Sequence, residues 1–348
     1  MNLLTISGSP HVHGKESVQK IMWGVVVAMI PLAVASVLFF GWNAVRVMII
    51  SVAACAILEW LIQKFIMKTP ATVGDGSAVI TGLLLAFNVP SNLDWWIIVI
   101  GAIIAIGVAK MSFGGLGKNP FNPALVGRVF LLISFPQQMT TWPKAKELIE
   151  QVPQAITAAT SGATQAIEVV ADATTGATPM GIIKGGLATG QDVSDVVAQL
   201  PDYVGSLIGQ HGGSLGEISV IAILLGGIFM LFRKIITWHI PVSFLGSAFI
   251  FAGIMHLINP GLYIPPMYHL MFGGIMLGAV FMATDMATSP MSSWGQVVFG
   301  IGCGLLTMII RLWGAYPEGV SFAILIMNAF VPLINRAFKP KRFGEKVK

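Results

Sequence analysis

Long apolar runs, each of the length that crosses a lipid bilayer, limit what this chain can fold into. A spanning helix needs roughly 20 apolar residues, and an interrupted span can be shorter. Only 10% of the residues are charged and 55% are hydrophobic, which is not the composition of a soluble domain. We therefore expect an all-α polytopic membrane protein with about ten transmembrane helices, two or three of them short or broken. The expected helices lie near 21–40, 44–66, 77–89, 94–109, 121–135, 217–232, 240–258, 266–284, 296–313 and 318–335.

The positions of Lys and Arg predict the topology, because cytoplasmic loops collect basic residues. With the N-terminus inside, most of them fall in the inner loops, Lys110 among these, and in the C-terminal tail, and the acidic 136–216 connection lies outside. The net charge of +5 is thus explained by topology and does not indicate nucleic-acid binding. The expected divisions are a cytoplasmic N-terminus (1–20), a first transmembrane repeat (21–135), an external loop (136–216), a second transmembrane repeat (217–335) and a basic cytoplasmic tail (336–348).

The two halves of the chain resemble each other at an offset of roughly 196 to 201 residues. The run from Gly82 is similar to the run from Gly278, and Lys110 falls opposite Arg311. Five spans in each half would make the second half enter the membrane from the opposite face, which gives two five-helix inverted repeats. Such folds place their functional groups between the halves. Two similar hydrophobic arrays with common turn residues remain an alternative explanation.

Polar residues within or at the ends of the spans are functional candidates, because burying a charge in lipid is costly. Asn88 and Asp285 occupy corresponding positions in the two halves and are interpreted as a paired interior feature. Asn122 begins a helix whose free amides could receive an anionic or polar group, although a packing kink also explains it. Glu59 could equally reach from a helix end toward the membrane surface. The full set of candidates is Glu59, Asn88, Asn122, Arg128, Asp285 and Arg311.

Motifs for other chemistry are missing from the sequence. Cys55 and Cys303 both lie in apolar runs and are interpreted as packing residues, and the six histidines lack metal-binding spacing, so we expect no metal site. The glycine-rich stretch 114–120 lacks the spacing of a phosphate-binding loop and is interpreted as a tight turn. Nothing supports catalysis by the chain's own side chains, so redox chemistry would need a borrowed cofactor.

Residues 172–178 read DATTGAT, a run of small residues and threonines in a chain that is otherwise mostly apolar. The run resembles the flavinylation motif of bacterial membrane redox complexes, in which a final Thr receives FMN through a phosphoester bond. The resemblance makes Thr178 the acceptor of covalent FMN, with Asp172 and Thr175 as motif residues. Ala173 departs from the usual Gly, and the leading Asp and the acceptor are both present.

A second run, Ser161–Thr164, repeats the end of this motif. Ala158 stands where the motif has Asp, so Thr164 ranks well below Thr178 as an acceptor. By spacing alone, a small threonine-rich loop is more often just a turn.

Separate blocks across nearly the whole chain resemble the D subunit of the Rnf complex, the ion-translocating ferredoxin:NAD oxidoreductase. The B subunit of the sodium-pumping NADH:quinone oxidoreductase belongs to the closest related family, but it carries a longer extension before its first span. Only about twenty residues precede that span here, which favours the Rnf resemblance. The blocks that carry the resemblance are 74–90, 118–142, 238–245, 281–290 and 314–334.

The resemblance implies an electron-carrying subunit with covalent FMN and, by similarity to the quinone-reducing relative, riboflavin held without a covalent bond between helices. Electrons would pass between this FMN and a flavin on the G subunit while Na+ or H+ crosses the membrane. The implied partners are Rnf subunits A, B, C, E and G, a flavin transferase and membrane lipid. The implied location is the bacterial cytoplasmic (inner) membrane, with both termini in the cytoplasm and the flavin loop outside. Our candidates for the second flavin or coupling site, which the family match does not assign, are Asn88, Asn122, Arg128 and Asp285.

Two other functions stay open on the sequence. The inverted repeat and the intramembrane Asp285 would also suit a secondary transporter with a midplane solute site. The third alternative is a scaffold subunit that carries no cofactor.

Overall fold

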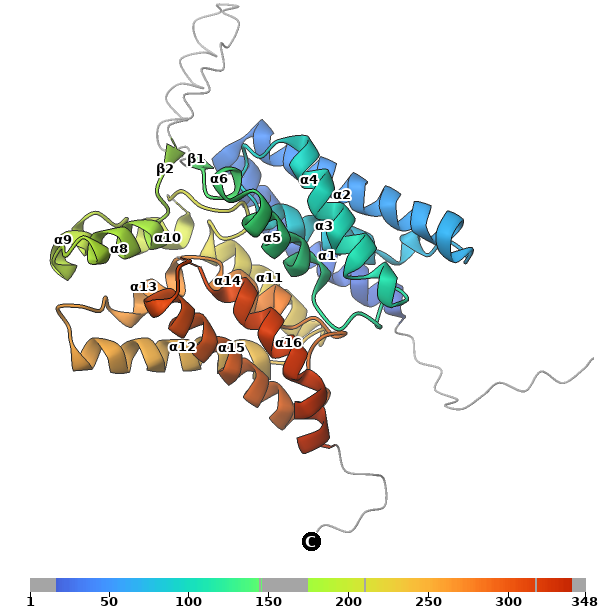
Figure 1. Cartoon of the computed structure of the whole chain (residues 1–348). Coiled ribbons are helices and arrows are strands. Elements are labelled where there is room, and N and C mark those ends of the chain that lie inside the picture. The colour runs from blue at the N-terminus through green and yellow to red at the C-terminus, as the bar shows by residue number, and fades with distance from the viewer. Residues whose placement is uncertain (1–16, 144, 146–174, 210, 317, 340–348) are drawn as a thin grey trace, which may run out of the picture.

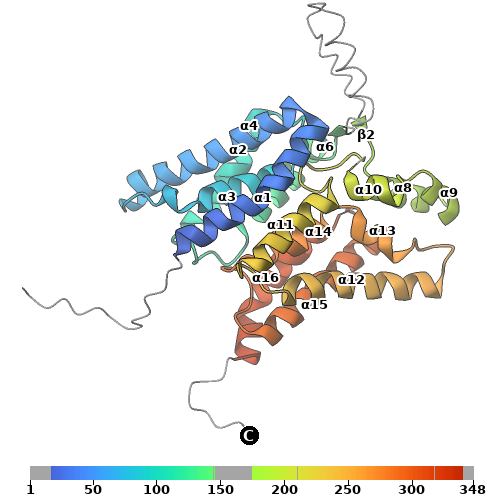
Figure 2. The same ribbon diagram turned by 180° about the vertical axis from the view of Figure 1, so that it is seen from behind.

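The computed structural model describes residues 17–143, 145, 175–209, 211–316 and 318–339. Within them the chain is almost entirely helical, and six helices are long and apolar enough to cross a membrane, which confirms a polytopic helical membrane protein. The blue-to-green helices α1–α5 form one group and the yellow-to-red helices α11–α16 form another (Figure 1), and the view from behind shows the same division (Figure 2).

The first group begins with two long helices, and its later helices are short or change their winding. α2 and α4 each continue into a π-helical turn, η1 and η3. The elements are α1 (Val18–Phe40), α2 (Trp42–Leu61), η1 (Ile62–Met67), η2 (Val73–Asp75), α3 (Ser77–Phe87), α4 (Trp95–Ala102), η3 (Ile103–Val108), η4 (Met111–Phe113), α5 (Pro123–Ser134) and α6 (Pro136–Met139).

Local chemistry explains where α5 begins. Pro123 occupies the first turn, where its fixed φ suits the helix, and the side chain of Asn122 accepts hydrogen bonds from the amides of Ala124 and Leu125 at 3.1 and 3.4 Å. The preceding turn carries positive φ at Gly114, Gly115 and Gly117, which confirms that 114–120 is a tight turn. After this turn, α5 begins inside the protein as a short apolar helix.

The second group contains a break that the sequence pattern did not indicate. One helix was expected over 266–284, but the structure has α13, a bend with Gly273 at φ +74°, and then α14 and η5. A Cβ on Gly273 would lie 2.5 Å from Nη2 of Arg311, so a buried guanidinium takes the space beside the bend. The elements are α11 (Val220–Phe232), α12 (His239–Ile258), α13 (Pro266–Met271), α14 (Ile275–Leu277), η5 (Gly278–Met282), α15 (Ser293–Trp313) and α16 (Val320–Ala337).

The described part of the connection between the groups is folded. A two-residue antiparallel pair, β1 (Trp142–Pro143) with β2 (Thr175–Gly176), leads into three short helices. Their apolar faces pack on α13, where Tyr203 stacks on Tyr268 with ring centroids 4.8 Å apart. These helices, which lie beside α13 in Figures 1 and 2, are α8 (Pro179–Ala188), α9 (Val193–Ala198) and α10 (Tyr203–Ile208).

The two groups meet along two pairs of helices. α1 packs against α11, and α5 packs against α16. The segment 211–219, which precedes α11, lies across the end of α3, because the amide of Gly216 donates to the carbonyl of Phe87 at 2.9 Å. Ser36 of α1 also donates to the carbonyl of Leu215 at 2.6 Å. One hydrophobic core therefore spans both groups.

Candidate functional site

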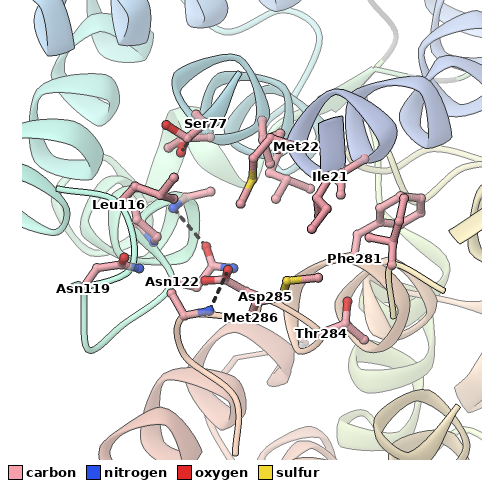
Figure 3. A pocket seen from close by; sticks show the side chains of 18 of the residues that line it. Ile21, Met22, Ser77, Leu116, Asn119, Asn122, Phe281, Thr284, Asp285 and Met286 are labelled. Carbon is pink, nitrogen blue, oxygen red and sulfur yellow. Dashed lines mark hydrogen bonds between the residues drawn. The ribbon is translucent and has the colours of Figure 1, made fainter. Parts of the chain in front are cut away.

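A cavity lies between α1, α3, the 114–122 turn and the segment that follows η5. Figure 3 shows side chains from these elements around it, with Asn119, Asn122 and Asp285 among its polar groups. The rest of the wall is mostly apolar, with Met22 and Phe281 as examples. Pockets of this kind, apolar with a few convergent polar groups, are the usual form of small-molecule sites. We call it the central cavity.

Three of the sequence candidates lie near the end of η5 and the residues just after it. Asn122 donates from Nδ2 to the carbonyl of Met282 at 3.2 Å, and Asn88 approaches the sulfur of the same residue at 3.7 Å. The carboxylate of Asp285 instead accepts from Thr288 Oγ1 at 3.1 Å and from the Ala287 amide at 3.4 Å. Asn122 and Asp285 line the central cavity, whereas Asn88 lies behind it.

A buried ion pair stands in the wall of the central cavity. Lys110 Nζ lies 2.6 Å from Glu59 Oε2 and donates to Ser77 Oγ at 2.7 Å. The two charged side chains are 2% and 1% exposed. The interpretation of Glu59 as reaching the membrane surface is therefore wrong. Sequence reasoning had assigned Lys110 to an inner loop, because a lysine at the end of an apolar run looks the same whether it turns outward or inward.

Thr178 stands at the N-terminus of α8, in the wall of a second cavity. Its Oγ1 accepts a hydrogen bond from the amide of Gly181 at 3.1 Å, and the residue is only 6% exposed. The hydroxyl is thus less open than the motif alone suggested, although Ala177 beside it is exposed. This cavity, which we call the Thr178 cavity, is lined by Arg128, Leu132, Met139, Thr140, Trp142, Ala177, Thr178, Gly181, Tyr316, Glu318, Ser321 and Phe322.

Arg128 belongs to the Thr178 cavity and not to the group around Asp285, which corrects its expected place. Its Nη2 lies 2.5 Å from Glu318 Oε2, and its Nη1 donates to Ser321 Oγ. Because Arg128 lies on α5 and Ser321 on α16, these bonds join the two groups of helices beside Thr178. The sequence kept Arg128 and Thr178 in separate candidate sites, and only the fold brings them to one cavity.

Arg311 and Glu217 are buried charged residues that do not line the Thr178 cavity. Arg311 of α15 donates to the carbonyls of His269 and Phe272, at 2.5 and 3.0 Å, and so satisfies carbonyls that the break after α13 leaves free. Glu217 accepts from the amide of Ser214 at 2.9 Å. Sequence reasoning missed Glu217 and Glu318, since both stand in turns just before helices. Their position next to long apolar runs was the available signal.

The structure describes only residues 175–178 of the flavinylation motif. The backbone of Thr175 pairs with Pro143, which ties this part of the motif to the chain that follows α6. Asp172 and the lower-ranked acceptor Thr164 lie outside the described residues.

Comparison with known proteins covers almost the whole chain. Residues 5–344 match the NQR2, RnfD, RnfE family. The D subunit of the proton-translocating ferredoxin:NAD+ oxidoreductase complex of Clostridium ljungdahlii is 41% identical, over 99% of this chain and 97% of its own length. The D subunit of the Na+-translocating ferredoxin:NAD+ oxidoreductase complex of Acetobacterium woodii is 42% identical, over 98% and 95%. The D subunit of the ion-translocating oxidoreductase complex of Erwinia tasmaniensis is 39% identical, over 98% of both chains.

The matches extend over nearly the whole chain at about 40% identity. The chain belongs to the NQR2, RnfD, RnfE family.

Proposed function

We propose that this chain is the D-type subunit of an Rnf complex and carries FMN on Thr178. In that role it relays electrons within a complex that moves them between ferredoxin and NAD and translocates Na+ or H+. The full-length similarity to subunits of that name supports the complex, and the geometry around Thr178 supports the attachment site.

The residues around Thr178 suit a flavin phosphate. The N-terminus of a ten-residue helix presents the positive end of its dipole, which favours an anion at this hydroxyl. Tyr316 and Phe322 stack with centroids 5.1 Å apart and offer flat apolar surfaces to an aromatic ring. When bound, FMN would supply the electron-carrying chemistry that the side chains lack.

The Thr178 cavity measures about 220 Å³. Pockets that enclose a whole small molecule usually measure roughly 300–1,000 Å³. A tethered flavin would therefore be only partly enclosed by this chain, and its exposed part could face a partner subunit. This arrangement agrees with the proposed exchange of electrons with the G subunit.

The central cavity is our proposed site for riboflavin. Amide groups of Asn119 and Asn122, the Asp285 carboxylate and the Lys110 ammonium converge there from both groups of helices. Such donors and acceptors match the carbonyl and imide edge of an isoalloxazine ring. The central cavity measures about 90 Å³ in this structure, below the roughly 300–1,000 Å³ of pockets that enclose a small molecule, so its apolar wall would have to move apart to cover the rest of the ring.

The topology belongs to the same proposal. We count the six long helices, the shorter α3, α5 and α11, and the broken α13–η5 segment as ten membrane segments in two inverted repeats of five. The pairing of α1 with α11 and of α5 with α16 supports this arrangement. Both termini would lie in the cytoplasm of a bacterium and Thr178 on the outer side of its inner membrane. The partners would be Rnf subunits A, B, C, E and G, and a flavin transferase.

The attachment can be tested directly. We expect flavin fluorescence to migrate with the chain on a denaturing gel when the chain is coexpressed with the transferase. Thr178→Ala should abolish the signal and Thr164→Ala should leave it, because only Thr178 has the leading Asp of the motif before it. Fluorescence retained in the Thr178 variant, or a colourless unmodified chain, would contradict the proposal.

The coupling ion does not follow from the comparisons. The names of two relatives with nearly equal identity to this chain specify a proton in one case and Na+ in the other. A secondary transporter would instead take up a solute in liposomes without other subunits and without flavin, so uptake by the isolated chain would favour that alternative.

A further inference from the structure

Glu217 is a buried carboxyl group that forms no ion pair among the described residues. The residue is 3% exposed and lies in the 211–219 segment, outside the helices. Its Oε1 accepts from the Ser214 amide at 2.9 Å, whereas its Oε2 has no hydrogen-bond partner among the described residues. Burying such an oxygen as part of an ionised carboxylate is costly, so its protonation state needs an explanation.

Glu318 is a neighbouring carboxyl group that does form an ion pair. It stands close enough to Glu217 for the two charges to interact, but it is paired with Arg128 through Oε2. Its second oxygen, Oε1, is also buried and without a partner among the described residues. Glu318 thus has a guanidinium in ion-pair contact, whereas Glu217 has none among the described residues.

The other charged or titratable groups around Glu217 do not pair with it in the described structure. Arg311 of α15 lies near enough for its charge to attract Glu217, but its Nη groups donate to the carbonyls of His269 and Phe272. His211, on the same segment as Glu217, contacts the Gly212 carbonyl with one ring nitrogen. The remaining ring, His269 of α13, has a buried Nδ1 without a partner among the described residues.

Two carboxyl groups that share a low-dielectric site cannot both ionise at low cost. The group with a cation keeps its charge, and the group without one keeps its proton. We propose that Glu217 is a proton-binding site that holds an exchangeable proton at neutral pH, with Glu318 connecting it to the Thr178 cavity. Glu318 lines that cavity and Glu217 does not, so the proton would enter and leave by way of Glu318.

The electrostatics of the site agree with this geometry. Burial and then the charge of Glu318 raise the pKa of Glu217, and although the Ser214 amide and Arg128 lower it, the pKa reaches about 8. Glu217 is therefore poised to change its charge when nearby charge changes. A phosphate or an electron added at Thr178 would favour protonation, and this last step alone rests on the proposed function.

Infrared spectroscopy of the intact complex in lipid would test the site. The unmodified protein should show the carbonyl band of a protonated carboxyl group, shifted in D2O, which disappears with a midpoint near pH 8. Glu217→Gln should remove this band. Glu59→Gln is the matched control and should leave it, since Glu59 is equally buried but paired with Lys110. A band that persists in the Glu217 variant, or that does not exchange in D2O, would overturn the proposal.

Two further variants test the connection. Glu318→Gln removes the neighbouring negative charge and should lower the midpoint of the band by about one pH unit, and an unchanged midpoint would refute the coupling of the pair. Glu217→Asp keeps a carboxyl group, so the band should remain with a changed midpoint. The same titration in a Thr178→Ala complex should still show the band, so failure of flavin attachment and failure of proton binding are separate results.

Discussion

Arg128 of α5 and Glu318 in the turn before α16 form a buried ion pair, with Nη2 2.5 Å from Oε2. The pair is separated by 190 residues along the chain and joins the two groups of helices at the Thr178 cavity. The stability that the ion pair contributes depends on both side chains, because each loses its hydration when it is buried.

Arg128→Gln should destabilise the protein by about 3–5 kcal/mol, since it leaves the Glu318 charge buried without its cation. Arg128→Met combined with Glu318→Leu should cost much less than the sum of the single changes, because no charge then remains unpaired. Thermal unfolding in lipid nanodiscs would measure the double-mutant cycle. Additive losses would show that the pair does not act as a unit.

The Glu59–Lys110 pair should behave in the same way at the central cavity. Lys110→Met alone leaves a buried carboxylate and should cost about 3–5 kcal/mol, whereas the double variant Glu59→Leu with Lys110→Met should be far closer to the unmodified protein. The same unfolding measurement applies. If riboflavin binds here, the double variant should also lose it, and flavin extracted by denaturation would be the readout.

Asn122→Ala should destabilise the protein by about 1–2 kcal/mol, because it removes the cap of α5 and the bond to the Met282 carbonyl. Asn92→Ala, at an exposed loop position, is the control and should change little. Unfolding temperature gives the stability effect. An equal effect of both changes would argue against a structural role for the Asn122 amide.

Gly273→Ala should be clearly destabilising, by about 1–2 kcal/mol for the left-handed backbone alone, and it would also displace Arg311. Gly253→Ala provides the matched control within α12, where a Cβ meets open space, and should stabilise the helix by about 0.5–1 kcal/mol. Unfolding of both variants in the same lipid would check the opposite signs. A tolerated Gly273→Ala would mean that the bend after α13 is not strained.

Stability should fall as the pH rises toward 8. The pKa of Glu217 is raised from 4.5 to about 8 in the folded protein, so below 4.5 the group is protonated in both states and its contribution is fully present. Between these values the unfolded chain releases a proton that the folded chain retains, and rising pH therefore favours unfolding. Unfolding temperature against pH should lose this slope in Glu217→Gln. An unchanged slope in the variant would assign it to another group.

The membrane location and the helical fold could be predicted from the sequence, because both follow from local properties. Lipid offers no partner to a backbone amide, so an apolar run of sufficient length must form a helix. Pro123 after Asn122 marks the start of α5, and the glycines of 114–117 mark a turn, since their effects act within a few residues. The motif that ends at Thr178 is local in the same sense, and its flavin stays a prediction.

Only the tertiary structure decided which polar groups meet. Arg128 was grouped with Asp285 by its place in an apolar run, yet it faces Glu318 and the Thr178 cavity. Lys110 was assigned to a loop, yet it is buried against Glu59. Helical periodicity says how residues repeat on one helix, but it does not say which distant helix they will face. That choice depends on packing across both groups of helices, where a buried charge is tolerated only beside its partner.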